Sequence, residues 1–221
     1  MSLEAYLQEL SDPQRPLVVS KLTNLSNLRP DELPFFRSAW AATGQERRRQ
    51  VVGQLSDLAE DNVELNFDEV FLVGLADPDA EVRLASVRAL WEHEGRGLIA
   101  TLLALMRSDA DAQVRAEAAL ALGRYVVRAA FDELRSTDAR AVDEALRDVI
   151  ADRGEVAEVR ARAVESLGAR NQPWVAPIIE EAYASPERRL RLSAVHAMGR
   201  SCDRRWLPAV LKELEPRFKP I

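Results

Sequence analysis

The sequence has 221 residues, of which 47% are hydrophobic and 30% are charged. This composition suits a folded protein of one or two domains whose helices expose polar faces. The formal net charge is −6. It argues against a broad nucleic-acid-binding surface, because phosphate groups demand a basic patch.

The sequence also gives indications of the cellular compartment of the protein. The single cysteine, Cys202, excludes an internal disulfide and fits a reducing compartment. The first residues lack a basic start followed by an apolar core, so we predict no signal peptide. The longest apolar run, residues 97–106, is too short to span a bilayer. We therefore expect a soluble, cytoplasmic protein.

Residues 1–29 are the least regular part of the chain. We predict helices over residues 3–10 and 15–25, which would cover the open edge of the first repeat, as terminal repeats must. We expect residues 1–29 to form an N-terminal cap.

Four segments of related sequence follow, and they begin at residues 77, 109, 154 and 185. Each has an arginine at the same place, and a weaker copy surrounds Arg48. The other aligned arginines are Arg83, Arg115, Arg160 and Arg191. Successive arginines are 35, 32, 45 and 31 residues apart, and three of these spacings match one helix-turn-helix unit of a solenoid. The spacing of 45 predicts an insertion at about residues 124–138.

Each copy has the apolar period of an α-helix. Apolar or small residues stand at positions −1, +3, +4 and +7 from the arginine, which is one face of a helix with 3.6 residues per turn. In the last copy these residues are Leu190, Ala194, Val195 and Met198.

The ends of these helices also carry signals. Asp77-Pro78 and Ser185-Pro186 each place a capping side chain before a first-turn proline. Three copies close on Gly123, Gly168 and Gly199, which we expect in the left-handed conformation after a helix.

Partner helices are predicted between these copies, and no segment shows the alternation of a strand. We place them at residues 30–43, 67–75, 98–108, 139–152, 174–184 and 206–214. Residues 30–214 then hold about five helix pairs and a final helix. We interpret residues 215–221 as a tail or the start of a linker.

The repeated pattern, Asp-x4-Val-Arg-x2-Ala-(Ala/Val)-x-Ala-Leu-Gly, resembles HEAT repeats, in particular the short variety also found in phycobilisome lyase subunits. The resemblance covers residues 30–214. It implies an all-α fold, a right-handed α-α superhelix of antiparallel helix pairs of the HEAT or armadillo type. It does not select a function, since this fold hosts scaffolds, adaptors and a few enzymes.

The resemblance also implies roles for charged residues. In HEAT repeats the arginine pairs with an aspartate in the turn of a neighbouring repeat, where Asp77, Asp79, Asp109 and Asp111 are available. We expect a structural ladder of charge-assisted hydrogen bonds, rather than direct ligand binding. Its members are Arg83, Arg115, Arg160, Arg191, Asp77 and Asp109.

The second helix of each pair lines the concave face in the proteins that this chain resembles. Positions +2, +5 and +9 from the arginine lie opposite the apolar stripe, and their side chains are mixed in charge. Trp91 stands where other copies have glycine, either as an interface anchor or folded back on the early repeats. The candidate partner-binding residues are Arg88, Trp91, Glu92, Glu117, Arg124, Arg162, Glu165, His196 and Arg200.

Motifs for catalysis are weak. The pair His93-Glu94 is similar to the His-Glu pairs of helical-repeat hydroxylases, but two histidines in the whole chain cannot assemble their di-iron site. Cys202 is adjacent to arginines that favour a thiolate, yet we interpret it as a plain unpaired cysteine. We expect no catalytic residue, metal or cofactor.

The favoured hypothesis is a non-enzymatic scaffold or adaptor that binds a protein or peptide along the concave face. Its oligomeric state is open, with a monomer favoured. The alternatives are a bilin lyase-like or other enzyme-associated subunit and, below it, a nucleic-acid-binding repeat protein.

Overall fold

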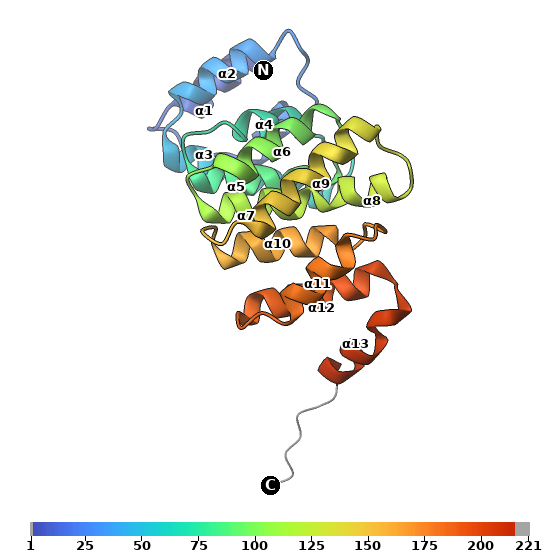
Figure 1. Ribbon diagram of the computed structural model, residues 1–221. Helices are drawn as coiled ribbons and strands as arrows, with labels where there is room; N and C mark the ends of the chain where they lie inside the picture. Colours follow the sequence, from blue (N-terminus) through green and yellow to red (C-terminus); the bar gives the residue numbers. More distant parts are fainter. Residues whose placement is uncertain (1, 215–221) are drawn as a thin grey trace. The chain divides into compact units, whose positions relative to one another are not determined.

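The computed structural model describes residues 2–214 and is entirely helical over them, without a strand (Figure 1). The all-α prediction is therefore confirmed. The expected tail, residues 215–221, lies outside the described residues. The α-helices are α1 (Leu3–Ser11), α2 (Leu33–Ala42), α3 (Gln45–Asp61), α4 (Asp68–Gly74), α5 (Ala80–Ala89), α6 (Gly97–Ser108), α7 (Ala112–Ala121), α8 (Gly123–Ala130), α9 (Ser136–Ala151), α10 (Ala157–Leu167), α11 (Val175–Tyr183), α12 (Arg188–Ser201) and α13 (Leu207–Leu214). The 3-10 helices are η1 (Val19–Leu25), η2 (Leu90–Glu92) and η3 (Arg204–Trp206).

The helices follow the repeat. We call α3, α5, α7, α10 and α12 the second helices, because each carries one of the aligned arginines, and α2, α4, α6, α9 and α11 the first helices. The insertion predicted by the 45-residue spacing forms α8 and the loop after it. The helix predicted at residues 15–25 is wrong in its first part. Val18 is extended, after Pro16, and only the 3-10 helix η1 follows.

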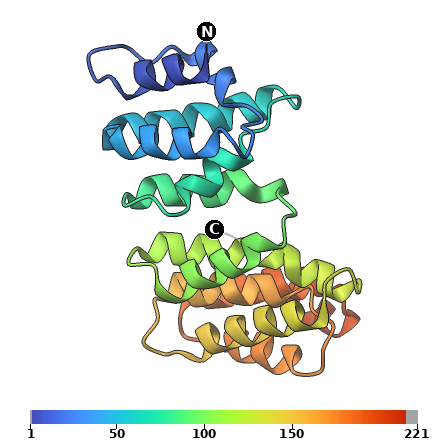
Figure 2. The same ribbon diagram turned by 90° about the horizontal axis from the view of Figure 1, so that it is seen from above.

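The chain divides into two compact units, one ending at Glu94 and one starting at Gly95. The repeat spacing does not predict this division. In the first unit α5 packs against α3 and α4, and α1 against α2. In the second unit α10 packs against both α7 and α12, and each of these second helices packs against its own first helix. The layers of helices within each unit can be followed by colour in Figure 2.

Apolar stripes at helical spacing make the core of each unit. On α6 the buried residues include Leu98, Leu102 and Met106, which recur every four residues and share one face. In the first unit Phe36 and Phe71 are almost fully buried. Burying a side chain of this size contributes about 1.5–3 kcal/mol, so hydrophobic burial supplies most of the drive to fold.

The caps of the second helices lie two residues later than predicted. Asp79, not Asp77, caps α5, and its carboxylate accepts the backbone N–H groups of Glu81 and Val82 at 3.1 Å. Asp111 does the same for α7. The Ser185 hydroxyl accepts the N–H of Glu187 before α12 starts. The Asp77 carboxylate does not cap α5, because it binds Trp40, Arg48 and the backbone N–H of Asp79. A second acidic residue, Asp79, therefore provides the cap.

The glycine prediction is wrong, and the reason is packing. None of the described glycines has a positive φ. A Cβ on Gly168 would lie 2.7 Å from the Cα of Ala197 in α12, and one on Gly123 would lie 3.3 Å from the Cα of Ser166 in α10. Glycine is therefore required for the close approach of successive second helices. Gly199 lies inside α12, and the left-handed residue after that helix is Cys202, with φ of 52°.

A pair of alanine substitutions tests this role. Gly168→Ala should destabilise the protein by about 1–3 kcal/mol, because the new methyl group meets backbone that cannot move aside. Gly199→Ala, in α12 with open space around it, should stabilise the protein by about 0.5–1 kcal/mol through helix propensity. Urea unfolding measures both. Equal, stabilising shifts for the two variants would contradict the packing role.

Candidate functional site

A buried charge network joins the first repeat to the next. The guanidinium of Arg48 lies 2.8 Å from the carboxylate of Asp77 and donates to the carbonyl of Thr43. Asp77 also accepts the indole N–H of Trp40 at 2.8 Å and the backbone N–H of Asp79 at 2.9 Å. Its side chain is fully buried. The carboxylate is thus held by three donors and bridges two successive repeats.

The other aligned arginines follow a related scheme. Arg115 donates to the carbonyl of Asp109 in its own turn and forms two 2.8 Å hydrogen bonds to Glu155 in the next. The Arg115 guanidinium holds the pKa of Glu155 below its ordinary value. Arg160 is buried and lies 3.3 Å from Glu187 of the following turn.

Arg83 and Arg191 each donate to two carbonyls of their own turn. Arg83 reaches the carbonyls of Asp77 and Pro78, and Arg191 those of Ser185 and Pro186. The five arginines therefore order the turn before each second helix. The side chains of Arg48, Arg115 and Arg160 also reach an acid of the next repeat.

Two candidate binding residues of the second unit are held in an ion-pair cluster instead. Arg162 lies 3.0 Å from Glu158 and 2.9 Å from Glu165, all on α10. Arg189 of α12 donates to Glu158 and lies 3.4 Å from Glu165. The hydroxyl of Ser193 donates to Glu165 at 2.6 Å. Glu165 is only 4% exposed, so its expected place on an open binding face is wrong.

This cluster carried a sequence signal that was missed. Glu158 and Arg189 stand two residues before the aligned arginine in consecutive copies. Second helices of consecutive repeats lie side by side, so equivalent positions of opposite charge are expected to meet. Arg189 accordingly holds the pKa of Glu158 below its ordinary value.

The remaining candidates of the second unit lie on three helices. Glu117 on α7 and Arg124 on α8 are half-buried, and the Arg124 guanidinium stacks 5.1 Å from the ring centre of Tyr125. On α12 His196 is exposed and Arg200 is half-buried. Arg124 was expected on a second helix, but it belongs to the inserted α8.

The three candidates of the first unit lie together. Arg88, Trp91 and Glu92 line one groove of about 900 Å³, formed by the end of α3, the segment before α4, and α5 with η2. Trp91 is 68% exposed, so the alternative in which it folds back against the early repeats is wrong. Beside this groove His93 shares a 2.7 Å hydrogen bond with Asp68.

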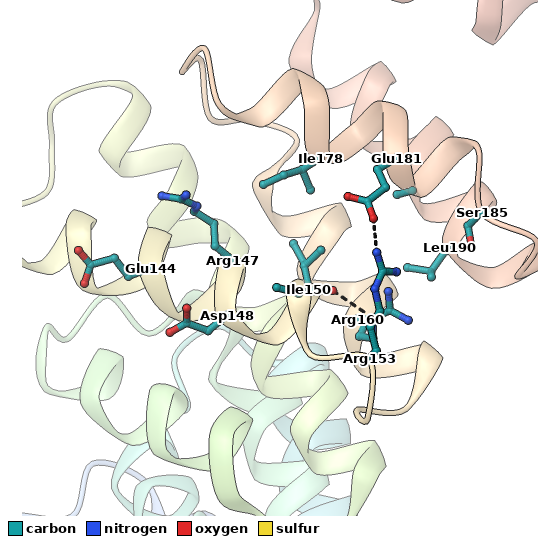
Figure 3. A pocket seen from close by; sticks show the side chains of 12 residues that line it. Glu144, Arg147, Asp148, Ile150, Arg153, Arg160, Ile178, Glu181, Ser185 and Leu190 are labelled. Carbon is teal, nitrogen blue, oxygen red and sulfur yellow. Dashed lines mark hydrogen bonds and ion pairs between the residues drawn. The ribbon is translucent and has the colours of Figure 1, made fainter.

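A second hollow lies in the second unit, between α9 and α11 (Figure 3). It has a volume of about 490 Å³, within the range of ligand pockets. Ile150, Ile178 and Leu190 give it apolar walls. Figure 3 shows the Glu181 carboxylate reaching to the Arg153 guanidinium.

The arginines of this hollow already have structural partners. Arg160 donates to the carbonyl of Ile150, and Arg147 lies 4.9 Å from the ring centre of Trp174. The hydroxyl of Ser185 accepts a backbone N–H. The described lining residues include no histidine or cysteine. The hollow therefore offers apolar contacts and paired charges rather than a nucleophile with its base.

Comparison with known proteins agrees with this architecture. Residues 69–153 match the family model of HEAT repeats, which confirms over this part of the chain the resemblance seen in the sequence. No curated protein sequence matches. Within residues 2–214, each helix falls short of the length or apolar character needed to cross a bilayer.

Solved structures are similar in fold. The complex of CpcE and CpcF of phycocyanin lyase from Nostoc sp. PCC7120 matches with a TM-score of 0.51 and 19% identity, over 77% of this chain and 99% of that chain. A designed armadillo repeat protein matches with a TM-score of 0.53 and 16% identity, over 90% and 100%. At these identities the likeness shows the α-α solenoid fold alone.

The buried network predicts a large loss of stability for Asp77→Ala. This substitution leaves Arg48 buried without its carboxylate, and breaking such a pair costs about 3–5 kcal/mol. Asp31→Ala removes an exposed partner of Arg29 and should leave the urea midpoint nearly unchanged. Similar midpoints for the two variants would show that the network does not stabilise the fold.

Acid should selectively weaken the cap of α5. Hydrogen bonds from Arg49 lower the pKa of Asp79 to about 2. Because the folded state favours the carboxylate, its contribution is complete at neutral pH and is lost as pH falls from about 4 to about 2. The stability difference between wild type and Asp79→Asn should shrink over that interval. A difference in urea midpoint that stays constant down to this pH would contradict the assignment.

Proposed function

We propose that this chain is a non-catalytic, cytoplasmic interaction module that binds a protein or peptide partner on the face of its second helices. One observation carries the proposal: Trp91 is largely exposed at the edge of a groove that Arg88 and Glu92 also line. Large exposed aromatic side chains beside arginine are typical anchors of protein interfaces.

The shape of the groove supports binding rather than catalysis. Its rim includes Val63, which is 95% exposed, so bulk water reaches it. The one hydroxyl among its described lining residues, on Ser56, donates to the carbonyl of Val52 in its own helix. A reaction would need a group that is both activated and shielded from water.

Contacts inside each unit would hold such a surface in one conformation. Buried arginines fix successive turns, as the contacts of Arg48 and Arg115 illustrate. A pre-organised surface loses little conformational entropy on binding. We further propose that residues 1–29 cap the first unit, where α1 packs on α2, and that residues 30–214 form the repeat region.

A lyase-associated subunit is the second candidate, favoured by the similarity in fold to the phycocyanin lyase complex. A bilin absorbs visible light, so this candidate expects a coloured complex when the purified protein is mixed with the free tetrapyrrole. An interaction module of the kind proposed here expects no visible absorbance after gel filtration.

Affinity capture from a lysate of the source organism tests the proposed face. The wild type is compared with Trp91→Ala and with the charge-reversed variant Arg88→Glu, Arg124→Glu, Arg200→Glu. A partner held on this face should be lost at least about tenfold with Trp91→Ala, because anchors contribute 2 kcal/mol or more. Its capture should also change with the charge-reversed variant, falling for an acidic partner and rising for a basic one.

The capture experiment needs a folded control variant whose net charge changes by the same amount. Arg128→Glu, Arg140→Glu, Arg188→Glu provides it, since these side chains are not among the candidate binding residues. Retention of the same partner by all variants would overturn the proposed face. The expected result is wild-type capture by the control and altered capture by the other two variants, with unfolding midpoints preserved.

A further inference from the structure

The sequence that forms much of the groove beside Trp91 is strongly acidic. Residues 50–82 contain nine carboxylates and no lysine, arginine or histidine. Two of the nine, Asp77 and Asp79, are buried and paired with Arg48 and Arg49. The others are solvent-accessible to different degrees. The first unit therefore presents a local negative surface.

Part of this negative surface lines the groove itself. Glu60, Asp68, Glu81 and Glu92 contribute carboxylates, against one guanidinium from Arg88. Glu81 also pairs with Arg49, and Asp68 shares a hydrogen bond with His93. They come from the end of α3, the start of α4, α5 and η2, so both sides of the groove are acidic. Carboxylates spaced around a hollow raise the local concentration of cations and steer them into it.

The same groove has apolar contact area. Trp91 and Val63 are both exposed and line it, and the half-buried Leu84 adds apolar surface. Tryptophan is the best side chain for a cation above its ring. A groove that combines a largely exposed indole, apolar walls and carboxylates matches side chains with an apolar stem and a positive head. Lysine and arginine have both parts.

We propose that this groove, which we call the Trp91 groove, binds a lysine- and arginine-rich segment of a partner protein. A cationic head lies over Trp91, its stem contacts Val63 or Leu84, and neighbouring basic side chains pair with Glu60 and Glu92. This inference rests on the proposed function and names the chemistry of its partner.

Charge complementarity argues for this occupant over an acidic one. An acidic segment would bring like charges against four carboxylates, which opposes association. A purely apolar segment would partly desolvate Glu60 and Glu92 without offering them a cation, which is costly. A basic segment satisfies them and uses the exposed apolar area as well.

A random library of short peptides displayed on phage tests the proposal. It is selected on the wild type, and the dissociation constants of the selected peptides are measured by fluorescence anisotropy. We expect peptides of clearly positive net charge, whose affinity falls as salt is raised. Trp91→Ala and the double variant Glu60→Gln, Glu92→Gln should each weaken binding by about tenfold.

A matched control separates the groove from the net charge of the molecule. Glu133→Gln, Glu180→Gln neutralises two exposed carboxylates of the second unit and changes the net charge equally. It should bind the peptides as the wild type does. Selected peptides without positive charge, equal weakening by both double variants, or no selected binder would each overturn the proposal.

Two further outcomes distinguish this inference from the proposed function. If a partner captured from lysate depends on Trp91 but not on Glu60 and Glu92, the basic-segment inference is wrong and the interaction module stands. If no substitution on the face of the second helices changes capture, the proposed function itself is wrong. Self-association of the wild type in sedimentation, abolished by Trp91→Ala, would make a second copy the occupant and overturn the inference.

Discussion

The buried pairing of an arginine with the next turn is the contact on which the repeat architecture depends. Arg48 and Arg115 each tie their own turn through backbone carbonyls and reach an acid of the following repeat. A buried cation is tolerated only when its donors are satisfied. The pairing therefore fixes the register between successive repeats, and side chains on the second helices acquire defined positions.

Close packing of small residues completes this register. Gly168 lies against Ala197, and Gly123 against Ser166, so neighbouring second helices approach backbone to backbone. Trp91 occupies the equivalent position in the copy that ends the first unit. An indole cannot make the contact that glycine makes. The tryptophan at this position is instead largely exposed and lines the Trp91 groove.

Sequence patterns were sufficient to predict the helices, because helix formation depends mainly on residues that are close together in the sequence. Apolar spacing and the arginine interval predicted both helices of each pair, and an interval of 45 residues predicted the insertion that contains α8. The glycines were misread because their role depends on a neighbour about 30 or more residues away. The prediction that Glu165 lies on an open face was wrong for the same reason, since its partners Arg189 and Ser193 lie on the next second helix. Trp91, Arg88 and Glu92 could be grouped from the helix wheel. Glu60 could not be grouped with them, because it comes from the preceding helix pair.

Hydrogen–deuterium exchange on the complex with a selected basic peptide tests the central claim most directly. The Trp91 groove would be the surface that the peptide covers, so amides of residues 56–68 and 81–92 should exchange more slowly in the complex than in the free protein. Amides of α9 and α11, around the hollow of the second unit, should be unaffected. Protection confined to α9 and α11, with residues 81–92 unchanged, would contradict the account.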